Sequence, residues 1–269
     1  SACATYGIDY QHTGQSPYVG PHEGVRLLWY IDNWLGDREM TMDSEGNFYN
    51  SSPYHIYKYN INGVLLNEYI RPVYMANCYP VLSPDEEYLL SSETLLTTDF
   101  MWVTQLDKNS EIYSTYSGFT SNGLPILVGK SGNNLITIVY DIAGTEIWRY
   151  QINDYNRRRY PLITHSNNII FGNTYQYAES GSYMWFYDMD GNRTIDEDNN
   201  VYIFYSNRVC LDKDGNEVWV IDNAEGIYYP SWHPDGFLLC NGNALYAFDP
   251  ADGSILWGPV LYDYDQHPS

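Results

Sequence analysis

The densest group of potential metal ligands lies between residues 188 and 198, where oxygen-bearing side chains alternate along the chain. Alternate residues of a tight loop face the same side, so their oxygens can converge on one hard cation such as calcium, which takes six to eight oxygen ligands. Without a cation the acidic side chains would repel one another, which favours a bound ion. The predicted calcium ligands are Asp188, Asp190, Asn192, Thr194, Asp196 and Asp198.

Two other interpretations of this segment stay open. Asp188 resembles Asp141 and Asp212, which precede glycine-containing turns, and it can be an ordinary hairpin residue. Asn192 and Asn50 each begin a sequence for N-linked glycosylation, and a glycan on Asn192 would prevent that residue from binding calcium.

The sequence contains one cluster of basic residues, at Arg157, Arg158 and Arg159. Three guanidinium groups can clamp a carboxylate or an acidic sugar through paired hydrogen bonds. The other interpretation is an interface role, in which they pair with acidic residues of an adjacent repeat or subunit. The six histidines lack the spacings of zinc sites, and no phosphate-binding loop or serine-nucleophile motif occurs.

The four cysteines, at positions 3, 78, 210 and 240, contain no CxxC pair. In an exported chain we expect some of them to be oxidised, and Cys210 with Cys240 is the favoured disulfide because these residues belong to neighbouring repeats. Two buried free thiols are the alternative. The first residues resemble the end of a lipoprotein signal, in which Cys3 would carry a lipid anchor, although Cys3 can also be an ordinary cysteine.

The amino-acid composition excludes some classes of binding partner. Thirty-four acidic residues against 13 basic ones give a net charge of −21, which excludes a nucleic-acid-binding protein that neutralises phosphates with a basic face. No apolar run is long enough for a transmembrane helix, and the hydrophobic content of 44% suits a folded core. The 29 tyrosines suit half-buried sheet surfaces and protein-binding faces.

A repeated unit runs along the chain: an alternating aromatic-rich strand, Asp or Asn, a turn that usually ends in Gly, and another strand. The Asp or Asn supplies side-chain hydrogen bonds to the turn, and the Gly supplies the positive φ that closes a hairpin. These turn positions are Asn60, Asp107, Asp141, Asp188, Asp212 and Asp249. A second signal is a proline that begins a strand, at Pro80, Pro125, Pro161 and Pro230.

This periodicity predicts an all-β protein, a β-propeller of about six four-stranded antiparallel blades. Too few residues lie between 188 and 200 for both an outer strand and a new inner strand, so five blades with a long inserted hairpin are the alternative. We expect an extended N-terminal segment over residues 1–24, a single propeller domain over 25–262 and a tail over 263–269.

The segment from Ala244 to Trp257 resembles the blade pattern of the PQQ-like β-propeller family, and the segment from Tyr10 to Pro21 resembles the opening of exported members such as BamB-type lipoproteins. The resemblance implies the fold, and no quinone is expected because the blade pattern marks architecture. In that family an N-terminal strand often closes the ring, and here Val25–Ile31 is the candidate. Because the last repeat has its own outer strand, one strand is surplus: it would pair with a neighbouring subunit or lie over the ring as a strap.

Together these patterns predict a non-catalytic, exported propeller at the cell surface or outside the cell, stabilised by calcium. It would bind a protein partner or serve as a structural, self-assembling component. A periplasmic or outer-membrane-associated location is the alternative. The alternative function is a quinoprotein-like or polysaccharide-acting enzyme with a funnel at one end of the ring.

Overall fold

The computed structural model describes residues 40–72, 74–75, 79–107, 113–153, 161–171, 175–177, 180–189, 191–222, 227–233, 235–242 and 244–261. Across these ranges the chain forms strands and turns and contains no helix. None of the described segments is therefore a helix that could cross a membrane.

The described residues form 24 strands in six four-stranded antiparallel sheets, which are the blades. Blade 1 contains β1 (Met40–Met42), β2 (Phe48–Ser51), β3 (His55–Tyr59) and β4 (Leu65–Ile70). Blade 2 contains β5 (Pro80–Leu82), β6 (Tyr88–Ser91), β7 (Thr94–Thr97) and β8 (Trp102–Gln105). Blade 3 contains β9 (Tyr113–Phe119), β10 (Pro125–Ser131), β11 (Asn134–Tyr140) and β12 (Glu146–Ile152).

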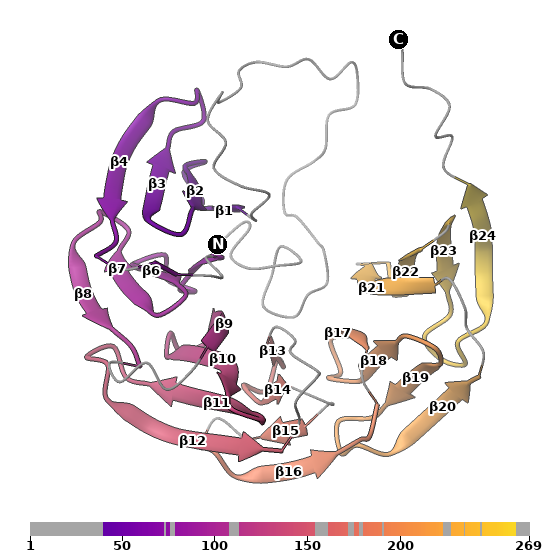
Figure 1. Cartoon of the computed structure of the whole chain (residues 1–269). Helices are drawn as coiled ribbons and strands as arrows, with labels where there is room; N and C mark the ends of the chain where they lie inside the picture. Colours follow the sequence, from indigo (N-terminus) through magenta and orange to yellow (C-terminus); the bar gives the residue numbers. More distant parts are fainter. Residues whose placement is uncertain are drawn as a thin grey trace.

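The second half of the chain repeats this arrangement. Blade 4 contains β13 (Leu162–Ile163), β14 (Ile169–Phe171), β15 (Tyr175–Tyr177) and β16 (Tyr183–Phe186). Blade 5 contains β17 (Asn192–Ile195), β18 (Val201–Phe204), β19 (Arg208–Leu211) and β20 (Glu217–Ile221). Blade 6 contains β21 (Ile227–His233), β22 (Phe237–Gly242), β23 (Ala244–Phe248) and β24 (Ile255–Leu261). The blades follow one another around a ring, and their fourth strands lie at its periphery (Figure 1).

The prediction of an all-β protein with six four-stranded blades is confirmed, and the five-blade alternative is wrong. Two predicted turn positions, Asp107 and Asp188, were misplaced. Each follows an outer strand, β8 or β16, and so lies in the link to the next blade instead of in a hairpin. Asp188 is therefore part of the link after β16, and β17 begins at Asn192, which removes the shortage of residues in this region.

Two hairpins between first and second strands explain part of the tyrosine content. In blade 5, Asp196 accepts hydrogen bonds from the Asn200 backbone N–H (2.8 Å), from Asn200 Nδ2 (2.7 Å) and from the Tyr202 hydroxyl (2.9 Å). Asp43 in blade 1 makes the same contacts with Asn47 and Tyr49. The buried carboxylate thus satisfies the polar tip of a tyrosine whose ring fills the core.

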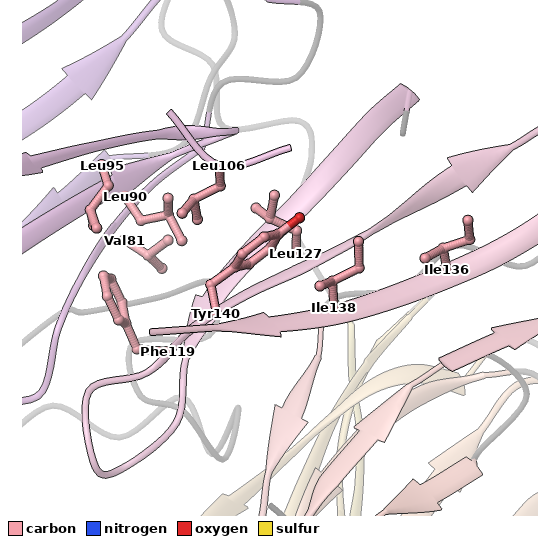
Figure 2. Packing of buried hydrophobic residues seen from close by; sticks show 9 residues of the cluster. All are labelled: Val81, Leu90, Leu95, Leu106, Phe119, Leu127, Ile136, Ile138 and Tyr140. Atoms are coloured by element: carbon pink, nitrogen blue, oxygen red, sulfur yellow. The ribbon is translucent and has the colours of Figure 1, made fainter. Parts of the chain in front are cut away.

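The apolar core lies between blades, and five clusters join successive pairs from blade 1 to blade 6. Between blades 2 and 3, for example, Leu90 and Leu95 face Leu127 and Ile138 across the interface (Figure 2). No such cluster of described residues joins blade 6 back to blade 1. The expected N-terminal segment, the strand over 25–31 and the tail over 263–269 all lie outside the described residues.

Candidate functional site

The rim of the ring, made of the six outer strands, carries most of the large apolar side chains that are exposed in the described chain. On β20, Val218 and Val220 are exposed, whereas the intervening Trp219 packs against the core between blades 5 and 6. The exposed apolar residues of the outer strands are Leu65, Leu66, Ile70, Trp102, Ile147, Tyr183, Met184, Phe186, Val218, Val220, Ile255, Leu256, Trp257 and Val260. Large apolar side chains that gather on one part of a protein surface are typical of an interaction surface.

The backbone of the outer strands also makes the rim suitable for binding another chain. Within the described residues each outer strand is the last strand of its sheet, so β12 bonds to β11 and β20 to β19. The outer edge of a last strand is the place where a sheet can accept an additional strand from another chain. Exposed apolar side chains and last strands therefore coincide on all six described blades.

A second cluster of chemically interesting groups is buried at blade 2. Glu93 and Asp107 are both buried, and the Leu106 N–H donates to the Glu93 carbonyl at 2.8 Å. Burial, together with the charge of Asp107, raises the pKa of Glu93 to about 7, against the lowering effects of Gln105 and Arg71. Glu93 can thus hold a proton near neutral pH, but protein covers both carboxyl groups. We assign the pair a role in stability.

Cys210 and Cys240 are free thiols buried in the cluster between blades 5 and 6. The predicted disulfide between them is therefore wrong, and the alternative of two buried thiols describes the structure. Burial raises the pKa of Cys210 to about 12, so this thiol stays protonated and unreactive. Cys3, the predicted lipid-anchor position, and Cys78 lie outside the described residues.

The structure changes the geometry of the predicted calcium segment. Asn192 and Thr194 belong to β17, so Asp188 and Asp198 lie beyond opposite ends of a strand that extends over about 10 Å. Calcium ligands lie about 2.4 Å from the ion, so these two carboxylates cannot share one site. Asp196 already accepts hydrogen bonds within its own hairpin. A single loop formed by all six residues is therefore wrong, and Asp190 lies outside the described residues.

The other predicted site residues fall in different environments. Asn50 is buried within β2, so a glycan on the folded protein is sterically excluded there. Asn192 is half-buried in β17, and its glycosylation stays a prediction. Arg157, Arg158 and Arg159 lie outside the described residues.

Six successive four-stranded antiparallel sheets around a ring, with their cores between neighbouring sheets, decide the fold. The protein is a β-propeller. No protein-family model matches this propeller, and no curated protein has a detectably similar sequence.

Solved propeller structures resemble the chain over most of its length. They include virginiamycin B lyase from Staphylococcus aureus, with 14% identity, 86% of each chain covered and a TM-score of 0.61. The Dos1 propeller has 12% identity, 81% of this chain and 68% of that chain covered, and a TM-score of 0.61. BamB from Moraxella catarrhalis has 9% identity, 82% and 73% coverage, and a TM-score of 0.55. At these identities the likeness confirms the BamB-like resemblance at the level of the fold.

Proposed function

We propose that this propeller is a non-catalytic protein-binding module and that its rim is the binding surface. The observation that carries the proposal is the coincidence of exposed apolar side chains with the last strand of the sheet on every described blade. A partner that adds a strand to β4, β12 or β20 would gain backbone hydrogen bonds and cover apolar side chains at the same time. The low-identity likeness to BamB is consistent with this role but does not carry it.

The charge of the chain determines under which conditions such a surface can be used. A net charge of −21 keeps copies of the chain apart at low salt, which protects an apolar rim from uncontrolled association. Screening by salt, or a basic partner, removes that repulsion. Export to the cell surface or beyond, with the periplasm as the alternative location, belongs to this proposal because the acidic composition suits a protein that works in salt.

Binding through the rim can be tested by self-association, in which a second copy of the chain serves as the binding partner. We expect sedimentation velocity to show a monomer at low salt and concentration-dependent association at about 1 M NaCl, where the Debye length is about 3 Å. The double variant Val218→Lys and Val220→Lys should remain monomeric, because it places charge on the exposed face of β20.

The matched control is the double variant Tyr54→Lys and Tyr74→Lys. These residues are also exposed, and their rings contact each other, but Tyr54 lies in the turn between β2 and β3 and Tyr74 in the link after β4, both outside the outer strands. This control adds the same charge and should associate like the natural chain. A natural chain that stays monomeric in high salt, or a control that loses association equally, refutes rim binding.

Calcium stabilisation is a separate part of the proposal, since the structure leaves part of the acidic segment undescribed. We expect calcium to raise the melting temperature of chelator-treated protein, because a bound cation relieves the repulsion between the acidic side chains. Scanning calorimetry with EDTA and then with added CaCl₂ measures this. An unchanged melting temperature contradicts calcium binding.

A further inference from the structure

Arg208 is a buried cation at the interface between blades 5 and 6. It is the first residue of β19, and 9% of its surface is exposed. It pairs across the sheet with Phe204 of β18, so the two side chains lie on the same face, and Phe204 belongs to the core shared with blade 6. The guanidinium carbon lies 4.5 Å from the centre of the Phe248 ring of blade 6, which holds the guanidinium over an aromatic face.

The guanidinium of Arg208 lacks the partners that a buried charge requires. Its Nε and Nη1 atoms are buried and have no hydrogen-bond partner among the described residues. No carboxylate of the described chain forms an ion pair with it. Burial lowers the pKa of Arg208, but an arginine keeps its proton at neutral pH. A buried cation with unsatisfied donors is unfavourable unless an anion balances it.

The polar groups closest to this interface do not supply a negative charge to Arg208. Burial raises the pKa of the Cys240 thiol far above its ordinary value, against the opposing effect of Arg208, so this thiol is neutral. The Cys210 thiol is neutral for the same reason. The buried Asp196 carboxylate accepts the hydroxyl proton of Tyr202 and the other hydrogen bonds of its own hairpin. Its printed partners are therefore all in blade 5, and Arg208 is not one of them.

The propeller architecture does not require a cation at this position. Arg208 stands four residues before Asp212, whose carbonyl accepts the hydrogen bond that closes the turn between the third and fourth strands of blade 5. Counting in the same way, blades 1 and 3 carry the fully buried residues Ile56 and Thr137 at this position. An apolar or small side chain therefore fills the same place in other blades.

Blade 2 shows how this chain treats a charge at the same position. The corresponding residue there is Glu93, and Gln105 and Arg71 both act to stabilise its ionised form. Arg71, itself buried, donates to the Ser91 hydroxyl at 2.6 Å. Buried charges between blades 1 and 2 are thus surrounded by polar partners, whereas the described surroundings of Arg208 are aromatic rings and neutral thiols.

We propose that Arg208 is the binding residue of an anion site between blades 5 and 6, and that its ligand is a small oxyanion of the carboxylate or phosphate class. The planar guanidinium donates along its edges, and this geometry matches the oxygens of both groups. Arg208 directly follows the hairpin turn that contains Tyr205, which is half exposed, so the site lies close to solvent. The bound anion supplies the charge and the acceptors that the described residues lack.

The substitution Arg208→Met tests this site, because methionine can still pack on Phe248 but carries no charge. In a buffer with chloride as the anion, we expect the variant to melt at or above the temperature of the natural chain, since it no longer buries an unbalanced cation. Sodium phosphate or sodium acetate, added at constant ionic strength, should raise the melting temperature of the natural chain by about 3 °C or more and leave the variant unchanged.

Arg149→Met is the matched control for the loss of charge. Arg149 is an exposed arginine of β12 that pairs with Glu146, so this variant removes the same charge outside the proposed site. It should keep the full response to the added anion. A second variant, Arg208→Lys, keeps the charge but loses the planar donor edges, and isothermal titration calorimetry should show at least about tenfold weaker binding than in the natural chain.

The two salts distinguish the two possible ligands. Binding of acetate without phosphate identifies a carboxylate ligand, and binding of phosphate without acetate identifies a phosphate ligand; both results support the site. Equal responses of the natural chain and Arg208→Met overturn it, and so does the absence of binding of either salt to the natural chain. These measurements use dilute protein at low salt, so their outcome does not depend on association through the rim.

Discussion

Replacing Gly215 by alanine lowers the stability of the propeller by about 3 kcal/mol. Gly215 has a φ of 84°, which disfavours any residue with a Cβ, and the added methyl would lie 2.6 Å from the Trp185 ring. Trp185 cannot easily yield, because it is buried and its indole N–H is bound to the Lys213 carbonyl. For a domain of this size the change corresponds to a fall of roughly 6–12 °C in melting temperature, which scanning calorimetry measures.

The matched control for this variant is Gly123→Ala. Gly123 has nearly the same backbone conformation, with a φ of 80°, but a Cβ there would meet no atom within 4 Å. This control isolates the backbone cost of about 1 kcal/mol, and its effect should be roughly a third as large. Equal effects at the two glycines would show that the contact between Trp185 and the Gly215 turn does not stabilise the interface between blades 4 and 5.

Replacing Glu93 by glutamine removes a pH-dependent loss of stability. The pKa of Glu93 rises from an ordinary value of 4.5 to about 7 in the folded protein, so the folded state binds this proton more tightly than the unfolded chain. Stability from this group is complete below about pH 4.5 and is lost as the pH rises toward 7. The loss amounts to about 3 kcal/mol. Urea unfolding at about pH 5 and pH 8 measures it.

The comparison that isolates Glu93 uses Glu87→Gln. Glu87 is an exposed carboxylate in the same blade, so this variant removes the same charge without changing the buried cluster. We expect Glu93→Gln to flatten the decline in stability between the two pH values, and Glu87→Gln to leave the decline as in the natural chain. Equal flattening in both variants would assign the decline to net charge and contradict the buried proton at Glu93.

The sequence predicted the blades well because hairpin chemistry is local. At Asp212 an Asp is followed three residues later by Gly215, and the structure shows the predicted hairpin with the positive φ at the glycine. Asp107 and Asp188 are also Asp residues that follow an alternating strand, yet each lies in a link between two blades. The pattern of a strand followed by Asp does not distinguish a hairpin from a link, because that depends on which strand is outermost in its sheet.

The calcium segment shows why the site was harder to predict than the fold. Alternate residues share one face in a tight loop and also in an extended strand, but in a strand they are about 6–7 Å apart and cannot converge on one ion. The sequence pattern around Asn192 and Thr194 fits both cases, and the structure adopts the strand. The raised pKa of Glu93 results from burial in the fold and from the charge of Asp107, against the charge of Arg71, so no local signal in the sequence predicts it.

Hydrogen–deuterium exchange of the natural chain in high salt, compared between dilute and concentrated solutions, tests the central claim most directly. Binding through the rim predicts that added protection appears in the outer strands, above all β4, β12 and β20, and that the first strands of the blades exchange equally in both solutions. Added protection confined to the turns at the two faces of the ring, with the outer strands unchanged, would contradict a binding rim.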